Sequence, residues 1–273
     1  MSGFTRATKE QAKLRMALIG PAGSGKPYTA LAIATNLGSK VALIDTERGS
    51  ASKYADEFMF DTLELDSFEP ERYIKGIQDA VTAGYDVLVI DSLSHAWAGK
   101  GGILEFVDTT ARRSQSKNSY TAWRDATPKH NALVDAILQA NLHVIMTMRS
   151  KTEYVLEDDG KGHKIPRKVG MQPIQREGME YEADVVADLD TDNNLIISKT
   201  RCPALSGKVF NKAGQDLADI LKAWLTSGAP MPDTVGIRQW RPELVKTPTP
   251  FIKPYNPLVD EPERMGRRDV GPQ

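Results

Sequence analysis

A glycine-rich stretch, GPAGSGK at residues 20–26, joins a short apolar run to a segment with helical spacing. Glycines in such a turn let successive backbone N–H groups point inward around an anion, and the helix that follows adds the positive end of its dipole. The closing lysine can bring a mobile ammonium to the outer phosphates of a nucleotide. In this strand–loop–helix context the pattern predicts a phosphate site for ATP. Its expected members are Gly20, Pro21, Ala22, Gly23, Ser24, Gly25, Lys26, Pro27 and Tyr28.

The residue after the loop lysine departs from the usual pattern. That position normally holds Ser or Thr, whose hydroxyl coordinates Mg²⁺, whereas this chain has Pro27. Proline is sterically acceptable in the first turn of a helix, where its missing N–H would have no intrahelical partner. Thr29 lies two residues further on, at a different angle on the helix, and does not stand at the usual ligand position. The sequence therefore predicts nucleotide binding together with weakened hydrolysis.

Strands and helices are expected to alternate over the rest of residues 14–226. Apolar runs typical of buried strands occupy residues 14–20, 40–45, 86–91 and 142–148, and a late pair of strands is expected at 182–190 and 194–200. Helical spacing of apolar residues marks 71–84, 128–141 and 213–228. Alternation of this kind requires crossover connections. It predicts an α/β fold with a mostly parallel sheet flanked by helices.

The composition is that of an ordinary globular chain. Of the 273 residues, 40% are hydrophobic and 26% charged, and 35 Lys+Arg against 36 Asp+Glu give a net charge of −1. This balance excludes nucleic-acid binding through global charge, but not through a local basic patch. The single cysteine, Cys202, excludes a disulfide framework and a four-cysteine zinc site. No apolar run approaches the ~20 residues that span a bilayer, and the start is polar, so we expect a cytoplasmic protein without a membrane partner.

Proline usage divides the chain into unequal parts. Nine of the 16 prolines follow Ser227, and this segment shows no apolar period. We expect an N-terminal extension at residues 1–13, a core at 14–228 and an extended Pro-rich tail at 229–273. Isolated aromatic residues in the tail are either anchors for a partner groove or parts of a solvated segment; they are Trp240, Phe251 and Tyr255.

Two acids follow predicted strands. Asp91 ends the buried strand 86–91, where an aspartate in phosphate-loop ATPases holds the Mg²⁺ shell, usually through water. Glu47 comes just after the strand 40–45 and could polarise a water for attack on the terminal phosphate. The alternative for Glu47 is a capping or surface acid in a loop.

These motifs together resemble the RecA/RadA ATPase core over residues 14–226. A narrower resemblance is to phage-encoded RecA-like ATP-binding proteins, a family that includes single-strand annealing recombination ATPases. It is carried by GPAGSGK…YTAL, VALIDTERGSAS, VLVIDSLSHAW, TMRSKTEY, VGMQPIQREGMEYEADVVADLD and SKTRCPALSG. Members usually have Thr where this chain has Pro27, so the departure affects a residue that takes part in catalysis.

The resemblance implies a RecA-like phosphate-loop core that binds ATP and Mg²⁺, and it implies roles for several residues. Glu47 matches the water-activating glutamate, Asp91 the metal-shell aspartate, and Thr147 the polar residue that senses the terminal phosphate. Lys199 and Arg201, in the sequence KTR, match the K-x-R element that reaches into a neighbour's ATP site. That role requires a homo-oligomer, either a ring or a filament. The alternative is an exposed basic strand end.

Two acid-free stretches are candidate surfaces for single-stranded DNA. Residues 160–176 are expected to form a mobile cationic loop, because they contain three glycines, and their basic residues are Lys161, Lys164, Arg167, Lys168 and Arg176. Residues 111–124 interleave Arg112, Arg113, Lys117 and Arg124 with Tyr120 and Trp123, which could stack on bases. The alternative for each is a solvated loop, and Trp123 could equally belong to a core.

The sequence therefore favours an ATP-binding, RecA-like protein that acts on single-stranded DNA in phage recombination or annealing, in the host cytoplasm. The tail could bind a single-strand-binding or recombination partner. One alternative is a nucleotide-gated DNA-binding module in which Pro27 has abolished turnover. Another is a phosphate-loop enzyme acting on a small molecule, such as a kinase, which the basic stretches disfavour.

Overall fold

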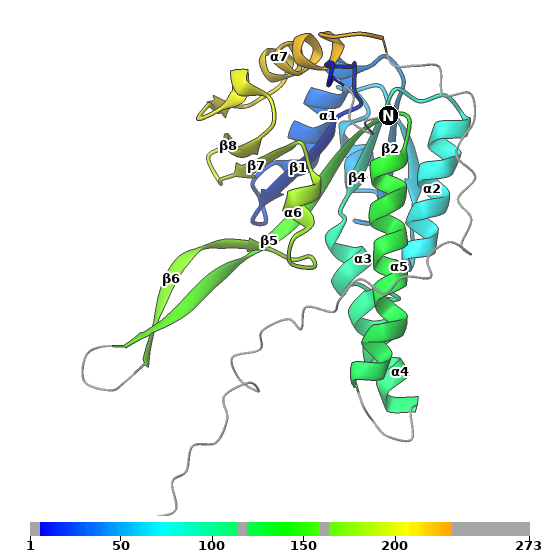
Figure 1. Cartoon of the computed structure of the whole chain (residues 1–273), viewed down its shortest axis with the longest axis vertical. Helices are drawn as coiled ribbons and strands as arrows, with labels where there is room; N and C mark the ends of the chain where they lie inside the picture. Colours follow the sequence, from blue (N-terminus) through cyan, green and yellow to red (C-terminus); the bar gives the residue numbers. More distant parts are fainter. Residues whose placement is uncertain (1–5, 114–118, 159–163, 231–273) are drawn as a thin grey trace, which may run out of the picture. The chain divides into compact units, whose positions relative to one another are not determined.

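A computed structural model describes residues 6–113, 119–158 and 164–230. In this part of the chain the strands form one nine-stranded sheet in the order β3-β2-β4-β5-β1-β7-β8-β9, with β6 paired to β5 (Figure 1). The first five strands along the chain are β1 (Arg15–Gly20), β2 (Val41–Asp45), β3 (Asp61–Glu64), β4 (Val87–Asp91) and β5 (His143–Asp158). The others are β6 (Lys164–Pro173), β7 (Val185–Leu189), β8 (Asn194–Thr200) and β9 (Val209–Asn211).

The sheet is parallel from β3 to β7 and antiparallel from β7 to β9. Every residue of β1 and β4 is buried. Such strands read as near-continuous apolar runs because helices cover both of their faces. The predicted α/β fold with a mostly parallel sheet is confirmed.

Two pairs of helices cover the two faces of the sheet. On one face, α1 (Lys26–Leu37) and α7 (Gln215–Thr226) pack through residues such as Leu31 and Leu221. On the other face, α2 (Pro70–Thr82) and α5 (Ser119–Gln139) pack through residues such as Ile77 and Ile137. Alternate residues of one strand contribute to the two cores, so Leu18 faces the first pair and Ile19 the second.

Short elements complete the fold. They are η1 (Ala51–Tyr54), α3 (Ser94–Ala98), α4 (Ile103–Arg113), α6 (Met179–Glu182) and η2 (Pro203–Leu205). A third, small core joins α4 to α5 through Ile103, Val107, Ala122 and Ala126. Trp123 is half-buried against this core, with its ring centroid 5.8 Å from that of Trp97. Of the two alternatives for Trp123, stacking on a base or packing in a core, the structure shows packing against a core.

The fourth predicted strand is longer than expected, and the segment after it is not a loop. The strand β5 runs from His143 to Asp158 rather than ending near residue 148, and β6 pairs with it in antiparallel register from Ser150↔Pro173 to Asp158↔Lys164. The prediction of a mobile loop at 160–176 is therefore wrong for residues 164–173. Thr152, Tyr154 and Val155 in β5 and Ile165 and Val169 in β6 are residue types that suit strands, and each strand satisfies backbone groups of the other.

Figure 1 shows the β5–β6 hairpin leaving the sheet. Three of the predicted DNA-binding residues, Lys164, Arg167 and Lys168, lie on β6, opposite Asp158, Val155 and Tyr154 in the register. Lys161 lies outside the described residues, as does Lys117 in the second basic stretch.

The two ends of the described chain are hydrogen-bonded to each other. Glu10 and Ala229 form a parallel bridge. The Gln11 N–H donates to the Ala229 carbonyl (2.9 Å), and the Ala229 N–H donates to the Lys9 carbonyl (2.9 Å). Residues expected in the extension and in the tail thus meet beside the end of α7. The three-part division stays a prediction, and the tail from residue 231 on lies outside the described residues, aromatic residues included.

No helix in the described ranges is long and apolar enough to cross a membrane.

Candidate nucleotide site

The glycine-rich loop connects β1 to α1 in a conformation that needs its glycines. Gly23 (φ 81°) and Gly25 (φ 74°) have left-handed backbones, which glycine adopts without steric cost. At Gly20 a Cβ would lie 2.5 Å from Ser24 Oγ and 2.7 Å from the Leu189 carbonyl oxygen. The loop therefore curls tightly over the end of β1, and α1 begins at its last residue.

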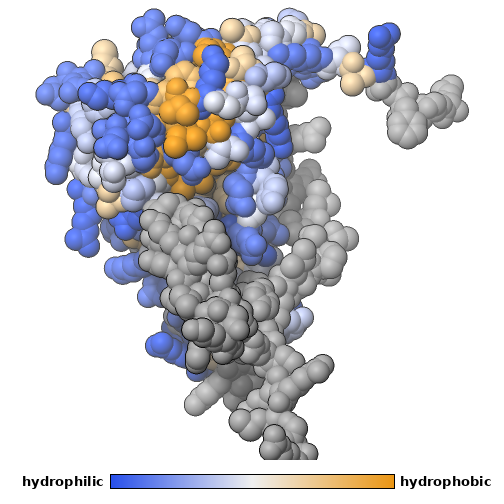
Figure 2. All heavy atoms as spheres, turned by 90° about the vertical axis from the view of Figure 1, so that its left-hand side faces the viewer, coloured by the Kyte–Doolittle hydropathy of each residue, from blue (hydrophilic) through white to orange (hydrophobic). Residues whose placement is uncertain are grey.

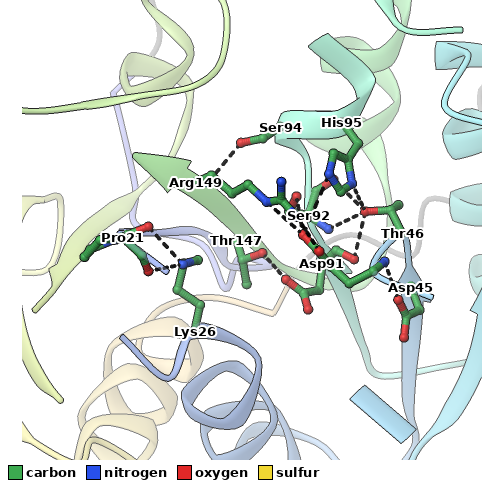
Figure 3. A network of polar contacts seen from close by, with 12 residues as sticks. Pro21, Lys26, Asp45, Thr46, Asp91, Ser92, Ser94, His95, Thr147 and Arg149 are labelled. Atoms are coloured by element: carbon green, nitrogen blue, oxygen red, sulfur yellow. Dashed lines mark hydrogen bonds and ion pairs between the residues drawn. The ribbon is translucent and has the colours of Figure 1, made fainter. Parts of the chain in front are cut away.

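The loop lysine lies against its own loop. Its Nζ donates hydrogen bonds to the carbonyls of Gly20 (2.9 Å) and Pro21 (2.6 Å), as Figure 3 shows. Burial lowers the pKa of Lys26, the charge of Arg149 lowers it further, and the carboxylates of Asp91 and Glu47 oppose the shift. The ammonium is held by neutral carbonyls that a phosphate can replace as its partner.

Pro27 fits the first turn of α1. The first intrahelical hydrogen bond runs from the Thr29 N–H to the Gly25 carbonyl (2.9 Å), so the proline removes no donor that the helix uses. The Thr29 side chain is buried. The first turn of α1 therefore accommodates Pro27. As a result, no hydroxyl stands at the position that usually holds Mg²⁺.

An aromatic cluster adjoins the loop on the side of η1. Tyr28, directly after Pro27, is partly exposed and lies edge-on to Tyr54 (5.5 Å between centroids) and Phe58 (5.1 Å). The sequence predicted Tyr28 as a nucleotide contact and gave no signal for its two ring partners, which η1 and the turn after it bring in.

Polar side chains follow the carboxyl ends of three adjacent strands beside the loop. Asp45 and Asp91 are register partners at the ends of β2 and β4, and Thr147 lies at the corresponding point of β5. In parallel sheets the carboxyl ends of neighbouring strands meet at one edge, where ligands bind. Figure 3 shows Asp91 and Thr147 pointing toward each other beside Lys26.

Asp91 is the buried acid of the cluster, with 3% of its surface exposed. Its Oδ1 accepts a hydrogen bond from the Thr147 hydroxyl, while its Oδ2 is buried without a hydrogen-bond partner among the described residues. Burial, reinforced by the charges of Glu47 and Asp45, raises the pKa of Asp91 to about 6, although Thr147 and Lys26 oppose the rise.

The unsatisfied oxygen fits a partner of Mg²⁺, because an orphaned buried acceptor can receive a water from the ion's shell. Among the described residues, no group of three or more His, Cys, Asp and Glu side chains could hold a metal. The nucleotide's own phosphates and water would supply the ion's other ligands.

Glu47 is ion-paired with an arginine that the sequence did not single out. Arg149 Nε lies 3.0 Å from Glu47 Oε1, and its Nη2 contacts Oε2, so the contact is bidentate. Ser92 Oγ donates to Oε1 (3.4 Å), and His95 Nε2 lies 3.9 Å from it. The signal was a basic residue directly after the predicted strand at 142–148, which alone has no specific meaning.

The acid before Glu47 supports the turn that carries it. The buried carboxylate of Asp45 accepts hydrogen bonds from the N–H groups of Glu47 (2.6 Å) and Ala51 (3.3 Å). Asp45 is therefore a capping acid, and it leaves Glu47 as the acid directed toward Arg149.

His95 holds the neighbouring strand ends together. Its Nδ1 lies 2.7 Å from Thr46 Oγ1, and its ring stacks on Phe68 at 4.8 Å. Burial lowers its pKa, although the charge of Glu47 opposes the shift. These contacts give His95 a structural role at the start of α3.

The remaining predicted residues lie elsewhere in the chain. Lys199 Nζ donates to the carbonyls of Glu180 (2.9 Å), Tyr181 (2.7 Å) and Ala183 (2.7 Å), and Arg201 pairs with Asp184 (2.9 Å). Both cations thus anchor the end of α6 within one chain, and their action on a neighbour stays a prediction.

Arg176, the last residue of the first basic stretch, is half-buried beyond β6. Its Nη1 lies 3.4 Å from Asn131 Oδ1 on α5, and burial lowers its pKa. Its guanidinium is thus partly engaged inside the fold, away from the strand that carries Lys164.

The fold and this site define a phosphate-loop nucleotide-binding core of the AAA/RecA-like ATPase superfamily. A family model described as an AAA domain matches residues 12–215, about three quarters of the chain, so the chain belongs to that family. No curated protein matches the chain. Members of this class bind nucleotide, typically together with Mg²⁺.

Proposed function

We propose that this protein is an ATP-dependent factor that acts on single-stranded DNA in phage recombination or annealing, as a homo-oligomer in the host cytoplasm. One observation carries the proposal. The strand β5 begins in the sheet beside the phosphate loop, passes Thr147 and Arg149, and continues into the hairpin whose other strand carries Lys164, Arg167 and Lys168. A single strand thus joins the nucleotide site to a cationic segment suited to a flexible polyanion.

At the nucleotide, the loop N–H groups and Lys26 hold the phosphates. Mg²⁺, when bound, neutralises the charge of the outer phosphates, and Asp91 Oδ2 accepts a hydrogen bond from its water shell. Glu47 orients the attacking water and accepts its proton once its carboxylate is free of Arg149.

Slow turnover follows from two observations. Pro27 offers no hydroxyl to the metal, and the carboxylate of Glu47 is engaged by Arg149. Both observations also favour a second candidate function. In it, the protein is a DNA-binding module that becomes ordered when nucleotide binds, and the nucleotide is not hydrolysed.

The proposed oligomer places Lys199 and Arg201 at the nucleotide of the next subunit, where a cation would stabilise charge on the phosphates. An exposed apolar pair on the outer strands supports self-association. Ile196 on β8 and Val209 on β9 are register partners, 41% and 59% exposed. Figure 2 shows hydrophobic side chains gathered on this side of the molecule. Contact with another subunit would bury them.

Two titrations test the proposed function. Fluorescent ATP with Mg²⁺ should bind the full chain, and Lys26→Ala should weaken binding at least about tenfold, because a charge-assisted contact is lost. Lys75→Ala, which removes an exposed lysine paired with Asp79 on α2, should leave binding unchanged. Labelled single-stranded DNA should bind more tightly than duplex, and more tightly with ATP than without it. Nucleotide binding without any DNA binding would favour the small-molecule enzyme instead.

A further inference from the structure

Arg149 is anchored by its backbone at the edge of the phosphate loop. Its Cα is the register partner of Gly20, the first residue of the loop. Its N–H donates to Ser94 Oγ (2.9 Å), and its carbonyl accepts from the Ile174 N–H (2.7 Å). The main chain is therefore fixed on both sides, while the side chain is 47% exposed and can change partners.

The guanidinium now faces a carboxylate, but its chemistry suits a phosphate equally. The planar fork of arginine donates two parallel hydrogen bonds to either group. Arg149 is also close enough to Lys26 for its charge to lower that lysine's pKa. The ammonium that meets the outer phosphates and this guanidinium therefore share one neighbourhood.

We propose that Arg149 binds the terminal phosphate of a bound nucleoside triphosphate, and that it leaves Glu47 to do so. The inference rests on the proposed nucleotide site and names a further phosphate ligand in it. Arrival of the third phosphate offers the guanidinium a second anion with the same fork geometry. The exchange frees the Glu47 carboxylate at the moment when a terminal phosphate is present. A nucleoside diphosphate provides no such anion, so Glu47 stays paired.

The exchange can be followed on the guanidinium itself. In the full chain with ¹⁵N-labelled arginine, the Nε–H resonance of Arg149 is assigned by its absence in Arg149→Lys. We expect this resonance to stay in place when ADP is added and to shift when a non-hydrolysable ATP analogue is added, both with Mg²⁺. It should also move in nucleotide-free Glu47→Gln, where the paired carboxylate is gone.

Affinity gives a second readout that does not depend on hydrolysis. In a Glu47→Gln background, which removes repulsion between that acid and the phosphates, Arg149→Ala should weaken binding of the ATP analogue about tenfold and leave ADP within about twofold. Arg72→Ala in the same background is the matched control, since it removes an arginine paired with Asp66 and Glu69 on the surface.

The outcomes separate the two levels of the proposal. If both nucleotides bind and the Arg149 resonance is the same with each of them, or if Arg149→Ala weakens both alike, the exchange is wrong and the nucleotide site stands. If neither nucleotide binds the parent chain, the proposed function fails, and the exchange fails with it.

Discussion

Pro27 sets the sharpest expectation for a single residue. Because its ring carries no hydroxyl, Mg²⁺ depends on phosphate, water and Asp91, and a small misplacement of metal or water can cost around 10²-fold in rate. Pro27→Thr restores the usual ligand on the first turn of α1. We expect steady-state ATPase activity with single-stranded DNA to rise at least about tenfold, which corresponds to about 1.4 kcal/mol of barrier.

Glu47→Gln in the Pro27→Thr background should remove that gain if Glu47 activates the water. Equally brisk hydrolysis by the parent and Pro27→Thr would contradict the argument, and would mean that another group, such as the Thr29 hydroxyl, already serves the metal.

Asp91 makes stability depend on pH in an unusual direction for an acid. Its pKa rises from the ordinary 3.8 to about 6 in the folded protein, so the unfolded chain loses this proton first as pH rises. The contribution of Asp91 to the free energy of unfolding therefore falls between about pH 4 and pH 6, and the loss is complete above that. Asp91→Asn should be more stable than the parent at pH 7.5, by on the order of 2 kcal/mol.

Thermal unfolding without nucleotide measures this effect. The difference corresponds to a rise of roughly 5 °C at pH 7.5 for a core of this size, and it should vanish near pH 4. A variant that is less stable than the parent at both pH values would show that the carboxylate is satisfied in the folded protein. We expect the stabilised variant to lose Mg²⁺-dependent ATP binding, since acids with strongly shifted pKa values are commonly found at functional sites.

Among the elements, the β5–β6 hairpin carries the DNA prediction. Replacing Lys164, Arg167 and Lys168 together by Ala should weaken binding of single-stranded DNA and flatten the dependence of affinity on salt, because fewer counterions are released. Fluorescence anisotropy over a salt series gives the slope. The matched control removes three cations from the second basic stretch, Arg112, Arg113 and Arg124. An unchanged slope in the hairpin variant, with a flattened slope in the control, would move the DNA to α4 and α5.

The elements also show how far sequence reasoning reaches. Apolar runs and the phosphate-loop pattern were enough to predict the parallel sheet, because a strand buried on both faces, such as β4, has a nearly continuous apolar sequence. The hairpin was missed because each of its strands pairs with the other rather than with a strand of the predicted sheet, and because its glycines and basic residues are typical of a loop. Arg149 was missed for a similar reason. Its meaning comes from register with Gly20 and contact with Glu47, which local sequence does not encode.

At the scale of the whole molecule, the meeting of the chain ends predicts where truncation becomes costly. A chain ending at Pro230 keeps the hydrogen bonds that join Lys9 and Gln11 to Ala229, whereas a chain ending at Ser227 loses them. At about 1 kcal/mol for each net hydrogen bond, the shorter chain should unfold several degrees lower. Differential scanning calorimetry compares the two. Equal melting temperatures, both matching the full chain, would show that the bridge contributes nothing to stability.

The strand β5 has a mechanical consequence. Its sixteen residues contain neither glycine nor proline, and its first half is hydrogen-bonded to β4 on one side and β1 on the other. Hinges need residues that absorb large backbone rotations, and the one irregularity in the β5–β6 ladder is the register shift between Glu153 and Tyr154. The hairpin thus extends directly from a strand that is hydrogen-bonded on both sides in the middle of the sheet. A force applied to the hairpin would reach the sheet through the part of β5 that contains Arg149. That part pairs with β1, the strand that leads into the phosphate loop.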